Sequence, residues 1–514
     1  MLLQWLWLIP LLPLLAAFVV ALRMLLGRDR GDAFEPATAR ISGGATLLAW
    51  LGLVALAVHV ALDEWPGPIR YGDWLTSGEL RLPITFHIDR LALGTALVLG
   101  FLIWLTHRFA AAYLHREAGF HRFYFALNLF GGGMLLILLA GNAFLAFVGW
   151  ELAGISSWLL IGYAYQRPVA TGNALRALVT NRIGDAAFIL GIAFSFIWLG
   201  GVEWQTFEQE RELLEPLNAS LLVLAFTTAA LAKSAQLPFS AWLGRALEGP
   251  TPSSAVFYGA VMVHAGVYLL LRLEPLLQQT PALMAVIAGI GLLTALYAWL
   301  CGLVQSDVKS ALVFATQTQV GLMFVAIGLG LFEVAAVHLA LHAVWRAHQF
   351  LTAPGYMHQV TRPAPPAPAW LRRRQWLYTA ALQRFWLDPI ANKLLLRTTQ
   401  TLGRDMRAFD DGVVSRLVGL PEQTRAAALL DDSGTAARGD GPSMVRAHGL
   451  AGAFMAWLAE RLHRFELRLV LQPGGGVVTR LLHRLGEQLV AIETLLEQPR
   501  YLLLLVMATL VVIL

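Results

Sequence analysis

The stretch LAKSAQLPFSAWLGRALEGPTPSSAV, residues 231–256, decides the fold because it places a lysine and a helix-breaking proline inside apolar sequence. Lys233 is one of only three lysines among 38 basic residues. Pro238 disrupts the helix and frees backbone carbonyls, which only neighbouring protein or water can satisfy inside a membrane. Broken helices at mid-membrane depth mark ion pathways in transporters. The stretch therefore predicts a broken transmembrane helix that carries a buried titratable amine.

The composition is that of a polytopic membrane protein. The chain is 57% hydrophobic and 14% charged, whereas soluble domains are about a quarter charged. The single cysteine, Cys301, excludes a disulfide framework, a cysteine-ligated iron–sulfur cluster and a thiolate zinc site within the chain. The net charge of +5 is typical of basic cytoplasmic loops, so we expect no nucleic-acid partner. No nucleotide-binding, flavin or haem signature occurs, and we expect no cofactor, no metal and no redox or hydrolytic site in this chain.

Apolar stretches long enough to cross a bilayer recur to about position 356. They lie at 2–26, 43–62, 88–113, 122–140, 142–164, 174–200, 218–246, 253–273, 281–303, 309–330 and 333–356. With a short terminal span at 501–514, they predict an all-α polytopic membrane protein of about 12 transmembrane helices. Arginines gather in every other connection, which predicts that the N-terminus lies outside and that the basic loops lie in the cytoplasm.

The character of the chain changes after the last of these long spans. RPAPPAPAWLRRR (362–374) is a proline-rich linker that leads into a basic cluster. We expect a long amphipathic helix over 375–418, a polar loop over 419–445 and a second amphipathic stretch over 446–496. The predicted domains are a bundle at 1–357, a cytoplasmic or interfacial tail at 358–499 and a membrane-spanning helix at 500–514.

Ionisable side chains inside the apolar spans are the candidate functional residues. Each costs several kcal/mol if it faces lipid, so all should face the bundle interior or internal water. They are Glu151, Arg182, Asp185, Lys233, His264, His338, His342, Arg346 and His348. Arg182 and Asp185 lie three residues apart on one helical face, which favours an ion pair. Glu151 and Lys233 belong to residue types that change protonation state when buried.

His338 and His342 lie four residues apart on one face of the last long span, and two functions are open for them. A zinc pair is conceivable, but the sequence has no HExxH motif and no nearby carboxylate triad. A proton relay is the better interpretation, because histidine changes charge near neutral pH.

Six sequence motifs carry a resemblance to a known family. They are FVGWELAGISSWLLIGY, ALVTNRIGDAAFILG, AKSAQLPFSAWLGRALEGPTPSSA, VHAGVYLL, SDVKSALVFATQTQVGLMF and HLALHAVWRAHQFL. Over about residues 85–355 the chain resembles the antiporter-like L subunit of bacterial complex I and its relatives. These relatives include the large subunits of multisubunit sodium/proton antiporters and DabB, the membrane half of an inorganic-carbon uptake system.

The resemblance implies a bundle built on inverted five-helix repeats. It implies that Glu151 pairs with Lys233 and that Asp185 tunes this pair. It also implies that protons pass along a central polar axis to which Lys309, His338 and His342 belong.

The chain departs from the family pattern at several positions. Tyr258 stands where the family usually has a histidine, and His264, about two turns further on, is the candidate for a partial replacement. Arg176 and Arg346 stand where lysines are usual. Arginine holds its proton at any relevant pH, so these two, with Arg182, are expected to tune the local field. The second repeat looks truncated, since the proline-rich linker follows the eleventh span directly.

These features favour a proton-conducting membrane subunit that couples proton movement to a partner's chemistry. Within that function, DabB-like uptake of carbon dioxide or bicarbonate with a soluble, zinc-containing DabA-like partner is preferred. The alternative is the L-type proton-pumping subunit of an NADH:quinone oxidoreductase, with complex I-type membrane subunits as partners. A cation/proton antiporter subunit is a further alternative, and a purely structural anchor would leave Glu151 and Lys233 without a role.

Overall fold

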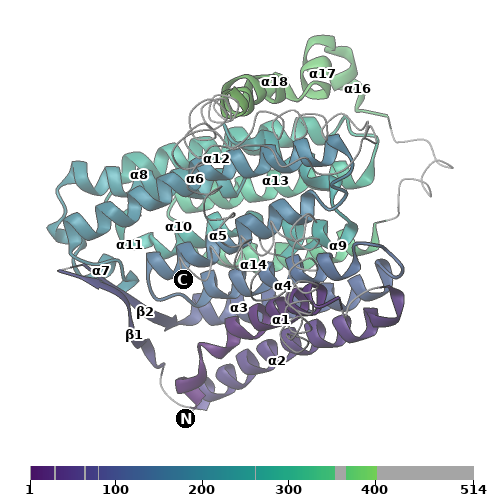
Figure 1. The fold of residues 1–514 in the computed structure, drawn as a ribbon. Coiled ribbons are helices and arrows are strands. Elements are labelled where there is room, and N and C mark those ends of the chain that lie inside the picture. Colours follow the sequence, from purple (N-terminus) through teal and green to yellow (C-terminus); the bar gives the residue numbers. More distant parts are fainter. Residues whose placement is uncertain are drawn as a thin grey trace, which may run out of the picture. The chain divides into compact units, whose positions relative to one another are not determined.

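The computed structural model describes residues 2–27, 31–62, 65–78, 80–260, 262–353 and 366–401. In these ranges, 10 helical segments are long and apolar enough to cross a membrane, and Figure 1 shows them side by side. They are α1 (Leu8–Leu25), α2 (Glu35–Leu62), α3 (Arg90–Tyr113), α4 (Phe120–Leu139), α5 (Ala143–Ile161), α6 (Pro168–Leu199), α8 (Pro216–Lys233), the segment Thr251–Arg272, α12 (Pro281–Gly302) and α13 (Val308–Gly328). The predicted all-α polytopic fold class is confirmed.

The eleventh predicted span is also a helix, α14 (Phe332–Thr352). It has 21 residues, which is enough to cross a bilayer. Its three histidines and Arg346 make it less apolar than the ten helices above. The predicted segments 402–418, 419–445, 446–496 and 501–514 lie outside the described residues.

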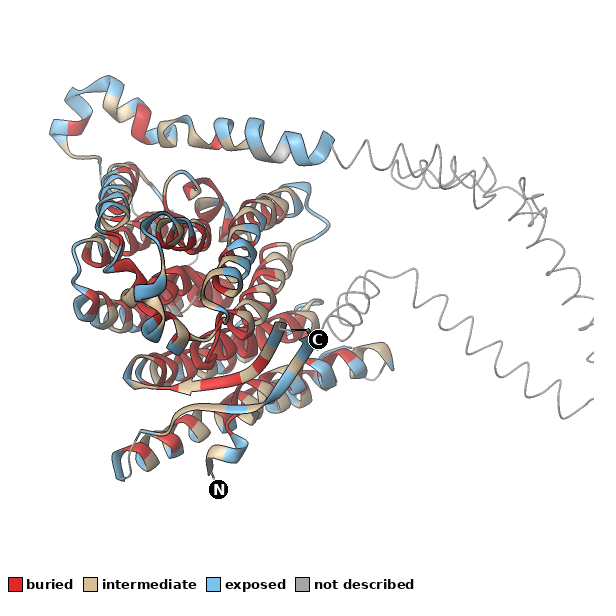
Figure 2. Cartoon of the chain, turned by 90° about the vertical axis from the view of Figure 1, so that its left-hand side faces the viewer, coloured by how far each residue is buried: buried red, intermediate tan, exposed pale blue. Residues whose placement is uncertain are grey.

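Helix α4 lies at the centre of the bundle. All of its residues except Arg122 are buried, and it packs against α1, α3 and α5. Figure 2 shows the same pattern, with buried positions on the inner helices and exposed ones on the outer faces. Gly133 of α4 meets Gly149 of α5 so closely that a Cβ on Gly149 would lie 2.5 Å from the Gly133 carbonyl oxygen. This contact fixes the turn of α5 that carries the next two residues, Trp150 and Glu151.

A β-hairpin was not expected from the sequence. Strands β1 (Gly67–Ser77) and β2 (Leu80–Ile88) pair antiparallel and lie beside α7 (Trp204–Gln209) at one end of the helices (Figure 1). The turn between α4 and α5 holds β2, because the Gly141 amide donates to the Thr85 carbonyl at 2.6 Å. The hairpin therefore fixes the end of the bundle at which α3 begins.

The helix break after Lys233 is confirmed, but its position differs from the predicted span 218–246. Helix α8 ends at Lys233, and Ala235 adopts the left-handed region with φ +52°. The chain resumes as a 3-10 helix, η4 (Ser240–Glu248). Two side chains donate hydrogen bonds to backbone carbonyls at the break. Trp242 Nε1 donates to Ala232 O at 3.1 Å, and Gln317 Nε2 donates to Ala235 O at 2.7 Å. The helix ends before Pro238 because that residue cannot continue its hydrogen-bond ladder.

The predicted span 253–273 is a composite helix. Its parts are α9 (Thr251–Ser254), the π-helical η5 (Ala255–Ala260), the 3-10 helix η6 (Met262–His264) and α10 (Ala265–Arg272). Segments of π-helix often mark functional sites. Near its start, α10 approaches α8 closely, since a Cβ on Gly266 would lie 2.3 Å from both Ala230 O and Ser234 Oγ.

The single long helix predicted over 375–418 is wrong in its described part. The chain instead forms α16 (Ala369–Arg373), α17 (Gln375–Leu382), η7 (Arg384–Trp386), α18 (Leu387–Ala391) and η8 (Asn392–Leu396). Phe385 and Trp386 have φ of +52° and +54°, which a continuous right-handed helix cannot contain. These short helices belong to the compact unit Met1–Leu396, so the predicted domain boundary at 357 does not coincide with the end of that unit.

Candidate functional site

Three helices bring the predicted central charges together around Trp150 of α5. The Trp150 indole donates to Asp185 Oδ1 of α6 at 2.9 Å. Lys233, the last residue of α8, donates from Nζ to the Trp150 carbonyl at 3.1 Å. The same Nζ lies 4.8 Å from the centroid of the Trp150 ring, within the range of a cation–π interaction. Lys233 is thus held by one carbonyl and one aromatic face.

Arg182 of α6 bridges the two carboxylates of the cluster. It forms an ion pair with Glu151 through Nη1, and its Nε lies 3.2 Å from Asp185 Oδ2. The predicted Arg182–Asp185 pair is therefore confirmed. Two carboxylates and two cations balance when all four groups are charged, which is the arrangement that a buried cluster requires.

The direct Glu151–Lys233 pair implied by the resemblance is wrong in this structure. Among the described residues, Lys233 makes no ion pair within 4.0 Å, and Arg182 occupies Glu151 instead. The reason is geometric, because the planar guanidinium of Arg182 presents several donors and reaches both carboxylates of adjacent helices. The Lys233 ammonium faces Gly154 beside Arg182, since a Cβ on Gly154 would lie 3.3 Å from Lys233 Nζ and 3.6 Å from Arg182 Nη2.

Glu151 can accept a proton while its ion pair with Arg182 stays in place. Among the described residues, Glu151 Oε1 is buried without a hydrogen-bond partner, whereas Oε2 contacts Arg182. A proton can therefore add to Oε1 while the contact at Oε2 stays in place. Protonation would leave two cations against one carboxylate, which disfavours the charged form of the Lys233 amine. In this arrangement, protonation of Glu151 would favour the release of a proton by Lys233.

A second cluster joins two of the predicted histidines. His264 Nε2 lies 2.9 Å from His342 Nδ1, and Arg346 Nε donates to His342 Nε2 at 3.4 Å. Because arginine cannot accept, His342 Nε2 is the acceptor and Nδ1–H donates to His264. Neutral His264 then carries its own hydrogen on Nδ1, which is buried without a hydrogen-bond partner among the described residues. We call this hydrogen-bonded pair of imidazoles the histidine wire.

His338 extends this wire on α14, and Lys309 does not. The rings of His338 and His342 lie 6.1 Å apart, and His338 Nε2 is 3.0 Å from Gln319 Oε1. Lys309 instead donates to Thr251 Oγ1 at 2.6 Å. It precedes Gln319 by ten residues of α13, which is about 15 Å of helix.

The two clusters meet at the broken helix. Ser234 follows Lys233 directly and faces Gly266, which is two residues beyond His264. Ser234 Oγ and Gln236 Oε1 are buried without a hydrogen-bond partner in the described part of the chain. Of these two atoms, Ser234 Oγ faces α10 at Gly266.

Arg176 and Tyr258 lie outside both clusters. Tyr258 donates to Leu243 O at 2.8 Å and stacks on Phe350. Arg176 Nη1 lies 4.0 Å from Asp388 Oδ1 of α18, a residue that sequence reasoning missed.

Asp388 also accepts from two further arginines that were not singled out. Arg245 of η4 donates to its Oδ2 at 3.0 and 2.6 Å, and Arg384 donates at 3.4 Å. The tail thereby contacts both α6 and the segment after the helix break. The signal in the sequence was an aspartate within a basic, aromatic stretch, RFWLDP.

Substitution of His342 by glutamine is expected to cut proton-coupled activity while the protein still assembles. Glutamine retains hydrogen-bonding groups but cannot take up a proton, so the His264–His342 wire is interrupted. His338→Gln should have a smaller effect, because His338 is joined to His342 only by a ring contact. Dye-quenching assays in inverted membrane vesicles measure both variants, with His59→Gln on α2 as the control. Full activity with both histidines replaced would reduce them to packing residues.

In the ranges that the structure describes, no group of three or more His, Cys, Asp or Glu side chains could hold a metal ion. If His338 and His342 bound zinc, the described residues would supply no third His, Cys, Asp or Glu ligand. Both histidines instead make the hydrogen bonds described above.

Comparison with known proteins places the chain in a family. Residues 140–387 match the family described as NADH:quinone oxidoreductase/Mrp antiporter, TM, and residues 74–124 match NADH-Ubiquinone oxidoreductase (complex I), chain 5 N-terminus. The first range contains the charge cluster and the histidine wire, and the second contains β2 and all of α3.

Curated relatives and solved structures agree with this match. The chain is 35% identical over 329 residues to NADH-quinone oxidoreductase subunit L of Rhodobacter capsulatus, covering 61% of this chain and 45% of that protein. It is 33% identical over 365 residues to NAD(P)H-quinone oxidoreductase chain 5 of a Synechocystis strain, covering 68% and 52%. The chain thus spans about half the length of these relatives.

Two solved structures share the fold. One is an Mrp complex from a Dietzia strain, with a TM-score of 0.57, 21% identity and coverage of 98% of this chain and 62% of that one. The other is a membrane-bound sulfane sulfur reductase, an archaeal respiratory membrane complex, with a TM-score of 0.58, 22% identity and coverage of 67% and 69%. Residues 140–387 therefore match the NADH:quinone oxidoreductase/Mrp antiporter family, and the chain is an antiporter-like membrane protein that resembles the L and chain 5 subunits.

Proposed function

We propose that this chain conducts protons as the L-type membrane subunit of an NADH:quinone oxidoreductase-like complex. The observation that supports this most is the presence of two titratable clusters beside one broken helix, one around Lys233 and one around His264, with Ser234 packed against Gly266 between them. Buried ionisable groups are costly inside a bilayer and are retained where ions or protons pass.

In the proposed path, a proton reaches Glu151 Oε1 and lowers the negative charge beside Lys233. Lys233 then gives up its proton across the break lined by Ser234. For His264 to accept it at Nδ1, both imidazoles take the other tautomer, in which His264 Nε2–H donates to His342 Nδ1 and the Arg346 contact to His342 Nε2 opens. The hydrogen bond then passes the proton to His342 on α14. A conformational change in the partner that moves α8 relative to α5 would set the direction of proton transfer.

The L-type function takes the place of the DabB-like carbon uptake that the sequence analysis preferred. The curated relatives given above are named as quinone oxidoreductase subunits, and DabB-like uptake gains no support from the comparisons.

Purification of the intact complex from native membranes, through a tag on this chain, tests the proposal. Flavin absorbance and iron–sulfur electron paramagnetic resonance signals should co-purify, together with NADH-dependent quinone reduction that acidifies one side of vesicles. A complex that contains zinc but neither flavin nor iron–sulfur clusters would contradict the L-type function. A complex that shows sodium-dependent proton exchange without a redox activity would favour an antiporter subunit.

A further inference from the structure

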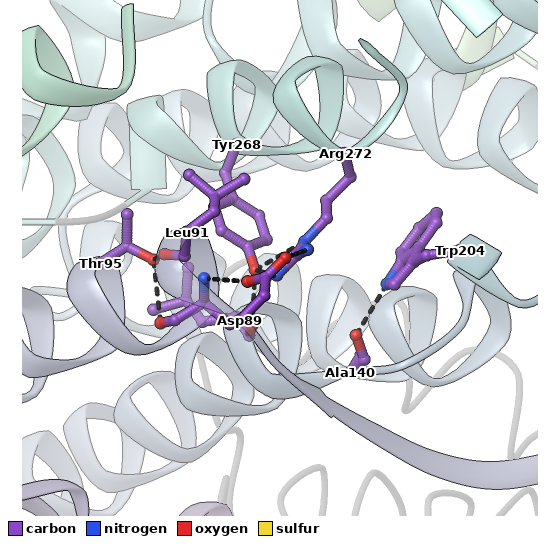
Figure 3. Close-up of polar contacts among 9 residues, drawn as sticks. Asp89, Leu91, Thr95, Ala140, Trp204, Tyr268 and Arg272 are labelled. Atoms are coloured by element: carbon purple, nitrogen blue, oxygen red, sulfur yellow. Dashed lines mark hydrogen bonds and ion pairs between the residues drawn. The ribbon is translucent and has the colours of Figure 1, made fainter. Parts of the chain in front are cut away.

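The carboxyl end of α10 is held by a polar network that no step of the proposed path uses (Figure 3). Arg272 binds Asp89 through two parallel contacts, Nη1 to Oδ2 at 2.5 Å and Nη2 to Oδ1 at 2.9 Å. Its Nε and Nη2 also donate to the Tyr268 hydroxyl at 3.0 and 2.8 Å. That hydroxyl in turn donates to the Leu138 carbonyl of α4 at 2.5 Å.

Asp89 ties this network to the start of α3. It is the N-cap residue of that helix, and its Oδ1 accepts from the Ala92 amide at 2.7 Å. The Arg272 side chain is only 6% exposed, so its charge depends on Asp89 for compensation. Burial raises the pKa of Asp89, but the charge and hydrogen bonds of Arg272 outweigh burial and hold that pKa below its ordinary value. The carboxylate therefore stays charged at neutral pH, and the network persists there.

The opposite end of α10 carries a member of the histidine wire. His264 is the residue that precedes α10, and it bonds to His342. The eight residues of α10 span about 12 Å, and a helix of this length moves as a rigid rod. The chain before His264 is wound as π- and 3-10 helix, in which the hydrogen-bond pattern changes within a few residues. The hydrogen-bond pattern on that side of His264 is therefore not that of one continuous α-helix.

We infer that Asp89, Arg272 and Tyr268 form a positioning clamp, which fixes α10 at one end and so keeps His264 at its other end within hydrogen-bond distance of His342. The three residues are positioning residues, since none of them contacts the histidine wire. The consequence for activity rests on the proposed proton path, whereas the consequence for the geometry of α10 does not. Proton transfer through such a wire depends steeply on distance, and a displacement of 1 Å costs roughly 100-fold.

Asp89→Asn removes the countercharge of the clamp but keeps the cap of α3. Asparagine caps a helix about as well as aspartate, so α3 keeps its Ala92 contact while Arg272 loses its countercharge. Hydrogen exchange of the full chain in its native complex should become faster over 262–272. Asp307→Asn is the matched control, because Asp307 also caps a helix, through Ser310 N at 2.8 Å, and makes no contact with α10. Unchanged exchange in Asp89→Asn would overturn the clamp, whatever the protein transports.

A double-mutant cycle then tests whether the clamp acts through His264. Asp89→Asn should lower proton-coupled activity roughly 10- to 100-fold. In the background of His264→Gln the same change should cost little more, because the group that the clamp positions is already gone. Losses that multiply would mean that the network supports the bundle in general. Tyr268→Phe keeps the Asp89–Arg272 pair and should give an intermediate loss of proton-coupled activity. This variant tests the clamp if Asp89→Asn does not assemble.

Discussion

Replacement of Lys233 by arginine is expected to remove most proton-coupled activity from a complex that still assembles. The Lys233 side chain is buried to 1% exposure, and the Trp150 carbonyl at 3.1 Å is its hydrogen-bond acceptor. A guanidinium keeps its proton at physiological pH and presents five donors in a planar fork. We expect a loss of roughly 100-fold or more, the usual scale of a lost acid–base group. Proton uptake by inverted vesicles, normalised to the amount of complex, measures it.

Two further variants test whether the loss of activity comes from the proton chemistry of Lys233. Lys393→Arg makes the same replacement at an exposed position of the tail and should leave activity unchanged. Lys233→Ala removes the charge and should be as inactive as the arginine variant. If Lys233→Arg works as well as wild type, Lys233 is a fixed charge and the relay through it is wrong.

Neutralisation of Glu151 is expected to have the second largest effect. Glu151→Gln leaves Arg182 and Lys233 opposed by Asp185 alone, so the cluster carries one uncompensated positive charge. Loss of one partner from a fully buried pair costs about 3–5 kcal/mol. Arg182 is 43% exposed, and solvent screening lowers the expected loss in free energy of unfolding to about 1–3 kcal/mol. Proton uptake should fall with it, because the group that accepts the proton is gone.

The double variant Glu151→Gln with Arg182→Gln separates stability from transport. It leaves Asp185 and Lys233 as a balanced pair, so thermal unfolding in detergent should return toward the wild-type temperature. Proton uptake should stay low. If uptake recovers together with stability, Glu151 and Arg182 serve only to hold α5 and α6 together.

The sequence was sufficient for the features that depend on neighbours along the chain. The fold class followed from apolar length, since a bilayer sets the span of a helix. The Arg182–Asp185 pair followed from a spacing of three residues, which places both side chains on one face of α6. The break after Lys233 followed from Pro238, and only its start was misplaced, because the chain leaves the helix before the residue that cannot continue it.

The contacts between helices required the tertiary structure. Spacing within α5, α6 and α8 does not show that Arg182 reaches Glu151 before Lys233 does, because helix rotation and the reach of the guanidinium fork decide it. The hydrogen bond of His264 to His342 crosses 78 residues, and the clamp of Asp89 on Arg272 crosses 183. The sequence by itself therefore determined which charges lie in apolar segments, but not which of them are buried, since Arg182 and His348 are exposed. Only the packing of helices decided which of these charges meet, because that depends on the distance and orientation between segments far apart in the chain.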